Sequence, residues 1–220
     1  MYTLIRTLIW MVIVALAVVA LCIFFRKKNP DKRLRQISIV FTVIFCFTIS
    51  GIMAMIPLEN SLITFTTPEA VFNYMYPERV MKDIVYGKES CMIINNEVGK
   101  EDNPEFLVVK GSGNDYKIGI GGVGGATQSI EVKTNRSSGV RTHIFRATDT
   151  DDYYLFAFLY SEKGEPSFSD ESNSEFTIIP INEANAAIYG FHQYLAYGYI
   201  SDVNSDYRLL LGEDTRIATY

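Results

Sequence analysis

The chain has 220 residues, 48% of them hydrophobic, and a formal net charge of −5. The charge divides unevenly: residues 1–58 carry seven cations and one anion, whereas residues 59–220 carry 13 cations and 24 anions. Such an acidic C-terminal part argues against nucleic acid as a partner, because phosphates need Lys and Arg to neutralise them. It argues equally against broad docking of that part on anionic lipid.

Two uncharged apolar runs, residues 8–25 and residues 37–58, dominate the N-terminal part. As helices they would be about 27 Å and 33 Å long at roughly 1.5 Å per residue, and the hydrocarbon core of a bilayer is about 30 Å thick. The linker between them, residues 26–35, holds six cations and one anion. Because cations are retained on the cytoplasmic side, we expect a two-helix transmembrane hairpin with a cytoplasmic basic loop 26–36. This predicts a multi-pass protein of the cell membrane with both termini, and the bulk of the chain, outside.

Two other interpretations of the first run stay open. One is a cleaved signal peptide, against which the stretch before the run holds only Arg6 while the cations follow the run. The other is a lipidated N-terminus, because residues 19–22 resemble a lipobox. Leu21 stands where that motif has a small residue, so we prefer the membrane hairpin.

Residues 59–220 suit one domain with a hydrophobic core of its own. Cys91 is the only cysteine in this part, so no disulfide can form within it, and Cys22 and Cys46 lie in the apolar runs. An extracytoplasmic domain without disulfides favours a bacterial cell envelope protein.

A short helix is expected first, over residues 67–76, with Thr67 as its N-cap and Pro68 at the first helical position. Apolar segments separated by turn residues then predict seven strands. These are residues 91–94, 106–109, 116–120, 128–133, 140–147, 153–160 and 176–181. Short loops between successive strands predict antiparallel neighbours in a meander. Residues 153–160 are apolar on both faces, so this strand should be central and covered on both sides.

The cover for the second face is expected from a helix over residues 183–200, which carries apolar residues at helical spacing and has Asn182 as a natural cap. Gly190 and Gly198 argue against this helix at about 1 kcal/mol each. The predicted fold class is therefore α+β: a two-helix transmembrane hairpin, then an extracytoplasmic antiparallel β-meander domain with one or two packed helices.

Two features could bind a ligand. Seven glycines between residues 111 and 125 could cradle a phosphate, but they lead into a strand rather than a helix, so we expect a wide turn. Asp149, Asp151 and Asp152 could hold a hard cation. The rest of a calcium loop is missing, however, so a solvated hairpin tip is the prediction. Neither a cofactor nor a metal site is expected.

Catalytic residues are equally sparse. His143 and His192 are the only histidines, and His143 could be paired on paper with Ser129 or Cys91. No local nucleophile motif supports such a pair. Cys91 lies in an apolar strand, where we interpret it as a small core side chain.

Tyrosines gather towards the C-terminus. Tyr189, Tyr194, Tyr197 and Tyr207 are predicted to form an interaction surface, because exposed tyrosine supplies contact area at a low cost in conformational entropy. The alternative is that these rings cover the sheet with their hydroxyls in water.

Two functions follow. The preferred one is a membrane-anchored, extracytoplasmic binding, sensing or accessory protein without catalysis, whose partners are the bilayer and another membrane or envelope protein. The alternative is an envelope-associated hydrolase with a His-assisted or acid-based active site. Anchor, sheet and aromatic side chains are explicit in the sequence whereas no catalytic pattern is, so a non-enzymatic role is favoured.

Overall fold

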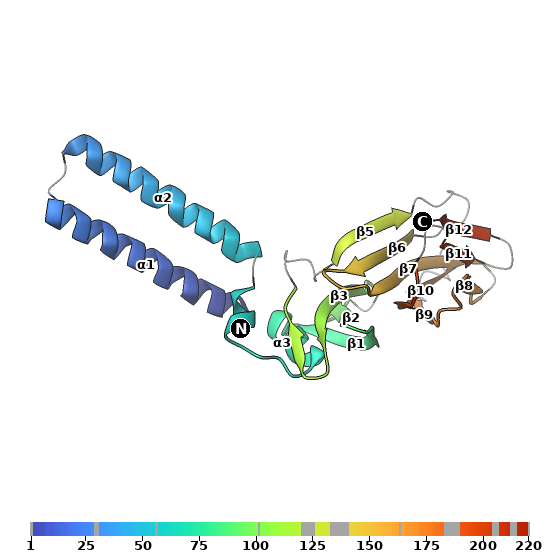
Figure 1. Cartoon of the computed structure of the whole chain (residues 1–220). Helices are drawn as coiled ribbons and strands as arrows, with labels where there is room; N and C mark the ends of the chain where they lie inside the picture. Colours follow the sequence, from blue (N-terminus) through green and yellow to red (C-terminus); the bar gives the residue numbers. More distant parts are fainter. Residues whose placement is uncertain are drawn as a thin grey trace. The chain divides into compact units, whose positions relative to one another are not determined.

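The structure, a computed structural model, describes residues 2–28, 31–55, 57–100, 102–119, 126–132, 141–162, 164–182, 190–203, 207–211 and 215–219. The chain forms two compact units, Met1–Leu62 and Ile63–Tyr220. In fold class it is α+β, with N-terminal helices followed by antiparallel β-sheets (Figure 1).

The first unit is a helical hairpin of α1 (Tyr2–Lys28) and α2 (Lys32–Met55), followed by the short 3₁₀ helix η1 (Leu58–Ser61). Asp31 caps the start of α2, because its Oδ1 atom accepts a hydrogen bond of 2.8 Å from the backbone N–H of Leu34. Among the described residues, one helix, over Leu8–Lys27, is long and apolar enough to cross a membrane, and a signal sequence can have the same composition.

The second unit begins with the predicted short helix, α3 (Pro68–Met75). The prediction of its start is confirmed: Thr67 is the N-cap, and its Oγ1 atom accepts a hydrogen bond of 3.2 Å from the N–H of Ala70. The helix contacts a four-stranded antiparallel sheet, sheet A. Its strands follow in chain order: β1 (Arg79–Tyr86), β2 (Ser90–Glu97), β3 (Glu105–Ser112) and β4 (Asp115–Lys117).

A central sheet, sheet B, has five strands in the order β5-β6-β7-β10-β9. They are β5 (Ala126–Val132), β6 (Arg141–Ala147), β7 (Tyr153–Ser161), β9 (Thr177–Ile181) and β10 (His192–Ile200). The prediction that residues 153–160 form the central strand is confirmed, because β7 is the middle strand. The meander is only partly right, since β10 lies between β7 and β9.

A third sheet, sheet C, has the order β12-β11-β8, from β8 (Phe168–Asp170), β11 (Arg208–Leu211) and β12 (Thr215–Thr219). Residues 168–170, which are not among the seven predicted strands, pair with β11. Strands β1, β11 and β12 were also not predicted.

Both faces of β7 are covered, each by a different sheet, because successive side chains of a strand point to opposite faces. Leu155, Ala157 and Leu159 lie on one face and pack against sheet C. Their partners there are Leu209 of β11 and Tyr207, which directly precedes that strand.

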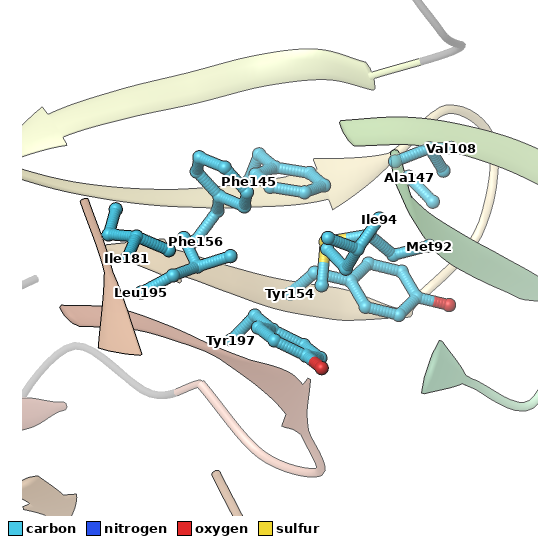
Figure 2. Close-up of a cluster of buried hydrophobic side chains, with 10 residues drawn as sticks. All are labelled: Met92, Ile94, Val108, Phe145, Ala147, Tyr154, Phe156, Ile181, Leu195 and Tyr197. Atoms are coloured by element: carbon cyan, nitrogen blue, oxygen red, sulfur yellow. The ribbon is translucent and has the colours of Figure 1, made fainter. Parts of the chain in front are cut away.

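The opposite face of β7 packs against sheet A. Tyr154 and Phe156 belong to a second cluster with Met92 and Ile94 of β2 and Val108 of β3 (Figure 2). The intervening residues of β2, such as Cys91 and Ile93, lie on the other face of sheet A, which α3 contacts. The order of layers is therefore α3, sheet A, sheet B, sheet C.

The predicted helix over residues 183–200 is wrong for its second half. Residues 192–200 form β10, and residues 183–189 lie outside the described residues. Tyr194, Leu195, Ala196 and Tyr197 are all buried, which a strand enclosed between two sheets requires and a helix with one apolar face does not. Gly198 suits the strand, because a Cβ there would lie 2.7 Å from the carbonyl oxygen of Glu175.

Candidate functional site

The structure does not place the predicted tyrosine surface on the outside of the domain. Tyr194, Tyr197 and Tyr207 are all buried, so the prediction that they form an exposed interaction surface is wrong. Tyr189 lies outside the described residues. For Tyr194 and Tyr197 the error follows from the helix that is expected over this segment, since β10 turns these two rings into the core.

Two of these tyrosines instead donate hydrogen bonds from their hydroxyls to carboxylates. The Tyr197 hydroxyl donates a hydrogen bond of 2.8 Å to Oδ2 of Asp83, which joins β10 of sheet B to β1 of sheet A. The Tyr207 hydroxyl donates one of 2.8 Å to Oδ2 of Asp170 in β8. Burial, and then the hydrogen bond to the carboxylate, raises the pKa of both tyrosines.

Asp170 is one of two buried carboxylates in the described part of the second unit that are surrounded by donors. Besides Tyr207, it accepts hydrogen bonds of 2.7 Å from the N–H and from the hydroxyl of Ser174. The chain reverses within this turn, where Asn173 has φ of +52°. Asp170 therefore fixes the end of β8 against the segment that leads into β11.

The second such carboxylate is Asp152, at the start of β7. Its Oδ1 atom accepts a hydrogen bond of 2.9 Å from the N–H of Lys88, and its Oδ2 atom accepts one of 2.7 Å from the N–H of Glu89. The Ser90 hydroxyl donates a third, of 2.7 Å, to Oδ2. We call Asp152, Ser90 and Tyr154 the Asp152 cluster, because the Tyr154 hydroxyl lies 2.9 Å from Ser90 Oγ.

The Asp152 cluster contains a serine next to a carboxylate, but its geometry suits a clamp better than a nucleophile. Ser90 has one hydroxyl proton, and once it is given to Asp152 the serine can only accept from Tyr154. Ser90 and Asp152 are each only 1% exposed, so a substrate could not reach either without the two hairpins separating. The arrangement fastens the β1–β2 turn of sheet A to the β6–β7 turn of sheet B.

The other residues of that acidic turn are taken by cations. Arg146 pairs with the Asp151 carboxylate, and Lys110 Nζ lies 3.7 Å from that of Asp149. The predicted solvated hairpin tip is right for exposed Asp151 and wrong for buried Asp152. No group of three His, Cys, Asp or Glu that could hold a metal ion occurs among the described residues.

The histidines do not come together. His143 lies half-buried in β6 opposite Phe156 of β7, and His192 is exposed at the start of β10 opposite Ser161. Their partners on β7 are five residues apart, which is roughly 16 Å along the strand. A site that uses both is therefore excluded by the register.

Cys91 is fully buried in β2. Burial, and to a smaller extent the Glu69 charge, raises the pKa of its thiol to about 12. A thiol in that state is not a nucleophile near neutral pH, which agrees with its interpretation as a core side chain. Of the glycine-rich segment, Gly111 and Gly113 form the β3–β4 turn with φ of +138° and +63°, while residues 120–125 lie outside the described residues.

Contacts within the described part of the chain do not explain the apolar surface of the helical hairpin. Large apolar side chains are exposed along both helices, among them Leu16 and Val19 of α1 and Phe41 and Phe47 of α2. Phe41 and Phe47 are 74% and 76% exposed. Contiguous apolar surface of this extent marks an interaction site or a membrane.

Comparison with known proteins adds no relative: no protein-family model, no curated protein and no solved structure matches the chain.

Proposed function

We propose that the chain is a membrane-anchored protein in which α1 and α2 both cross the bilayer and hold the β-sheet unit outside the cytoplasm. The observation that carries this proposal is the exposure of apolar side chains on both helices of the hairpin. In water this surface would be strongly unfavourable, at roughly 25 cal/mol for each Å². In a bilayer the same side chains contact lipid tails.

The polar side chains of α2 support the same proposal. The hydroxyls of Ser38, Thr42 and Thr48 donate hydrogen bonds of 2.9, 2.9 and 3.0 Å to the carbonyl oxygens of Leu34, Ser38 and Ile44. Each partner is four residues back in the same helix. Polar groups that are satisfied within their own helix are what a hydrocarbon environment requires.

The cations decide the proposed orientation. Arg26, Lys27, Lys32, Arg33 and Arg35 lie at the end of the hairpin where the helices connect, and all are exposed. Positive residues in short connections are retained in the cytoplasm. Both ends of the hairpin, and the unit that follows α2, would then lie on the outer face.

For the outer unit we propose a binding or accessory role without catalysis. The two buried carboxylates in the described part of this unit have structural partners: the Asp152 cluster joins sheets A and B, and Asp170 binds Ser174 and Tyr207. Cys91 is buried with a protonated thiol. The hydrolase remains the second candidate through His143, which lies half-buried in the central sheet.

The orientation can be tested by cysteine labelling in intact cells. Cys22 and Cys46 are replaced with alanine, whereas buried Cys91 is retained because its thiol is protonated. An impermeant maleimide should label Asn114→Cys, on the exposed β3–β4 turn, and should spare Asn29→Cys until the cells are opened. Labelling of Asn29→Cys with protection of Asn114→Cys would reverse the proposed orientation. Labelling of both in intact cells would exclude the hairpin.

A further inference from the structure

A groove of about 570 Å³ runs between the two helices of the hairpin. From α1 it is lined by Ala17, Ala20, Leu21 and Phe24, and from α2 by Ile37, Ser38, Phe41, Thr42 and Phe45. This volume lies in the range of ligand sites in proteins, about 300–1,000 Å³.

The walls of the groove are apolar in their chemistry. Its two hydroxyls, those of Ser38 and Thr42, already donate to carbonyl oxygens of α2. They therefore have no proton left for a hydrogen bond across to another helix, which is a common means of association between membrane helices. Such a groove suits an apolar occupant better than a polar one.

Helical spacing relates two cations near the connection to the residues that line the groove. On α1, Lys27 follows the lining residue Phe24 by three positions, and on α2, Arg35 precedes Ser38 by three. Residues three apart lie on the same face of a helix. Arg35 is also held near the connection, since its guanidinium lies 5.4 Å from the ring centroid of Phe25. Helical spacing therefore puts cations of both helices, Lys27 and Arg35 among them, on the faces that line the groove, towards the connection between the helices.

We propose that the hairpin binds an anionic phospholipid of the cytoplasmic leaflet, with an acyl chain in the groove and the headgroup phosphate between Lys27 and Arg35. Charge complementarity selects this occupant, because a phosphate needs the cations and a hydrocarbon tail needs the apolar walls. The inference rests on the proposed membrane hairpin. It differs from general attraction of lipid to a basic loop, because it assigns the contact to two of the cations and one face.

The test uses the full-length protein, reconstituted in bilayers of phosphatidylcholine with a fixed fraction of phosphatidylglycerol. Trp10, the only tryptophan, is replaced by phenylalanine, and a single reporter is introduced as Phe41→Trp in the groove. Phe47→Trp is the matched control, because Phe47 is equally exposed and does not line the groove. Mid-chain bromine atoms, on one lipid class at a time, quench the reporter that they contact.

Brominated phosphatidylglycerol should quench the Phe41→Trp reporter in clear preference to brominated phosphatidylcholine at equal mole fraction, with little preference at Phe47→Trp. Lys27→Gln with Arg35→Gln should remove the preference, by about fivefold for each cation lost. Arg26→Gln with Lys32→Gln removes the same charge from the loop but not from the groove face, and should leave it.

Each other outcome overturns a defined statement. Equal preference at both reporters, or equal loss with both pairs of substitutions, would mean that anionic lipid only accumulates beneath the basic loop. Quenching at Phe47→Trp but not at Phe41→Trp would mean that protein fills the groove, as a third helix or a second copy. Quenching at neither reporter would show that α2 is not in the bilayer, which would overturn the proposed function itself.

Discussion

The carboxylate of Asp152 and the hydroxyl of Ser90 lie 2.7 Å apart although they are separated by 62 residues in the chain. With the two backbone N–H groups of Lys88 and Glu89, this contact joins the β1–β2 turn of sheet A to the β6–β7 turn of sheet B. One side chain thereby satisfies three donors of another hairpin.

Replacing Asp152 with alanine should destabilise the domain. Ser90 and the two backbone N–H groups would lose their acceptor, and a buried donor left unsatisfied costs about 1–3 kcal/mol. We expect a loss of at least about 2 kcal/mol in the free energy of unfolding, measured by urea titration of the full chain in detergent micelles. Asp151→Ala is the control: its pair with Arg146 is exposed, so the change should stay within about 1 kcal/mol. Equal effects of the two substitutions would show that the Asp152 cluster is not a clamp.

Gly87→Ala should be destabilising for a steric reason. A Cβ at this position would lie 2.5 Å from the Tyr154 hydroxyl oxygen and 2.7 Å from Cγ of Asp152. Overpacking of a buried site costs about 1–3 kcal/mol. Gly99→Ala offers a comparison, because Gly99 has φ of +80° but open space around it, and so measures backbone strain alone. A smaller loss of stability for Gly87→Ala than for Gly99→Ala would contradict the close approach of the two hairpins.

Truncation on either face of the central strand should be costly, because a sheet covers each face. Phe156 faces sheet A and Leu155 faces sheet C. We expect the free energy of unfolding to fall by about 3–5 kcal/mol for Phe156→Ala and by about 2–5 kcal/mol for Leu155→Ala, measured by thermal or urea unfolding. Tyr160→Ala, at the exposed end of the same strand, should cost about 1 kcal/mol or less. If Leu155→Ala resembled Tyr160→Ala, sheet C would not cover that face.

The domain should lose stability in alkali. Burial raises the pKa of Tyr154, Tyr197 and Tyr207 above the usual value, and that of Cys91 to about 12. Below about pH 8.5 these groups are neutral in the folded and the unfolded chain, so their contribution to the free energy of unfolding is fully present there. Above that pH the unfolded chain releases their protons first, which lowers the free energy of unfolding as the pH rises through about 10.

Urea midpoints across this range, read beside tyrosinate absorbance, provide the measurement. Tyr207→Phe should make the loss with pH less steep, because one group with a raised pKa is gone. Complete tyrosine ionisation before unfolding would refute the burial of these hydroxyls.

Several elements could be predicted because local physics determines them. The cap formed by Thr67 and Pro68 places α3, and the apolar segments between turn residues place β2, β3, β6 and β7. The strand with apolar residues on both of its faces is the central one, because burial on two faces leaves no position for polar residues. The charge division between residues 1–58 and 59–220 follows from the sequence in the same way.

Only the tertiary structure decided what covers β7 and where the tyrosines point. Residues 192–200 have apolar side chains at spacings that suit a helix and a strand alike. The segment forms a strand because it pairs with β7 on one side and with β9 on the other. Once β10 lies between β7 and β9, the side chains on both of its faces are buried, and the Tyr197 hydroxyl binds Asp83. Sequence periodicity describes one element at a time, whereas burial on two faces and a contact such as Asp152 with Ser90 arise only when distant elements meet.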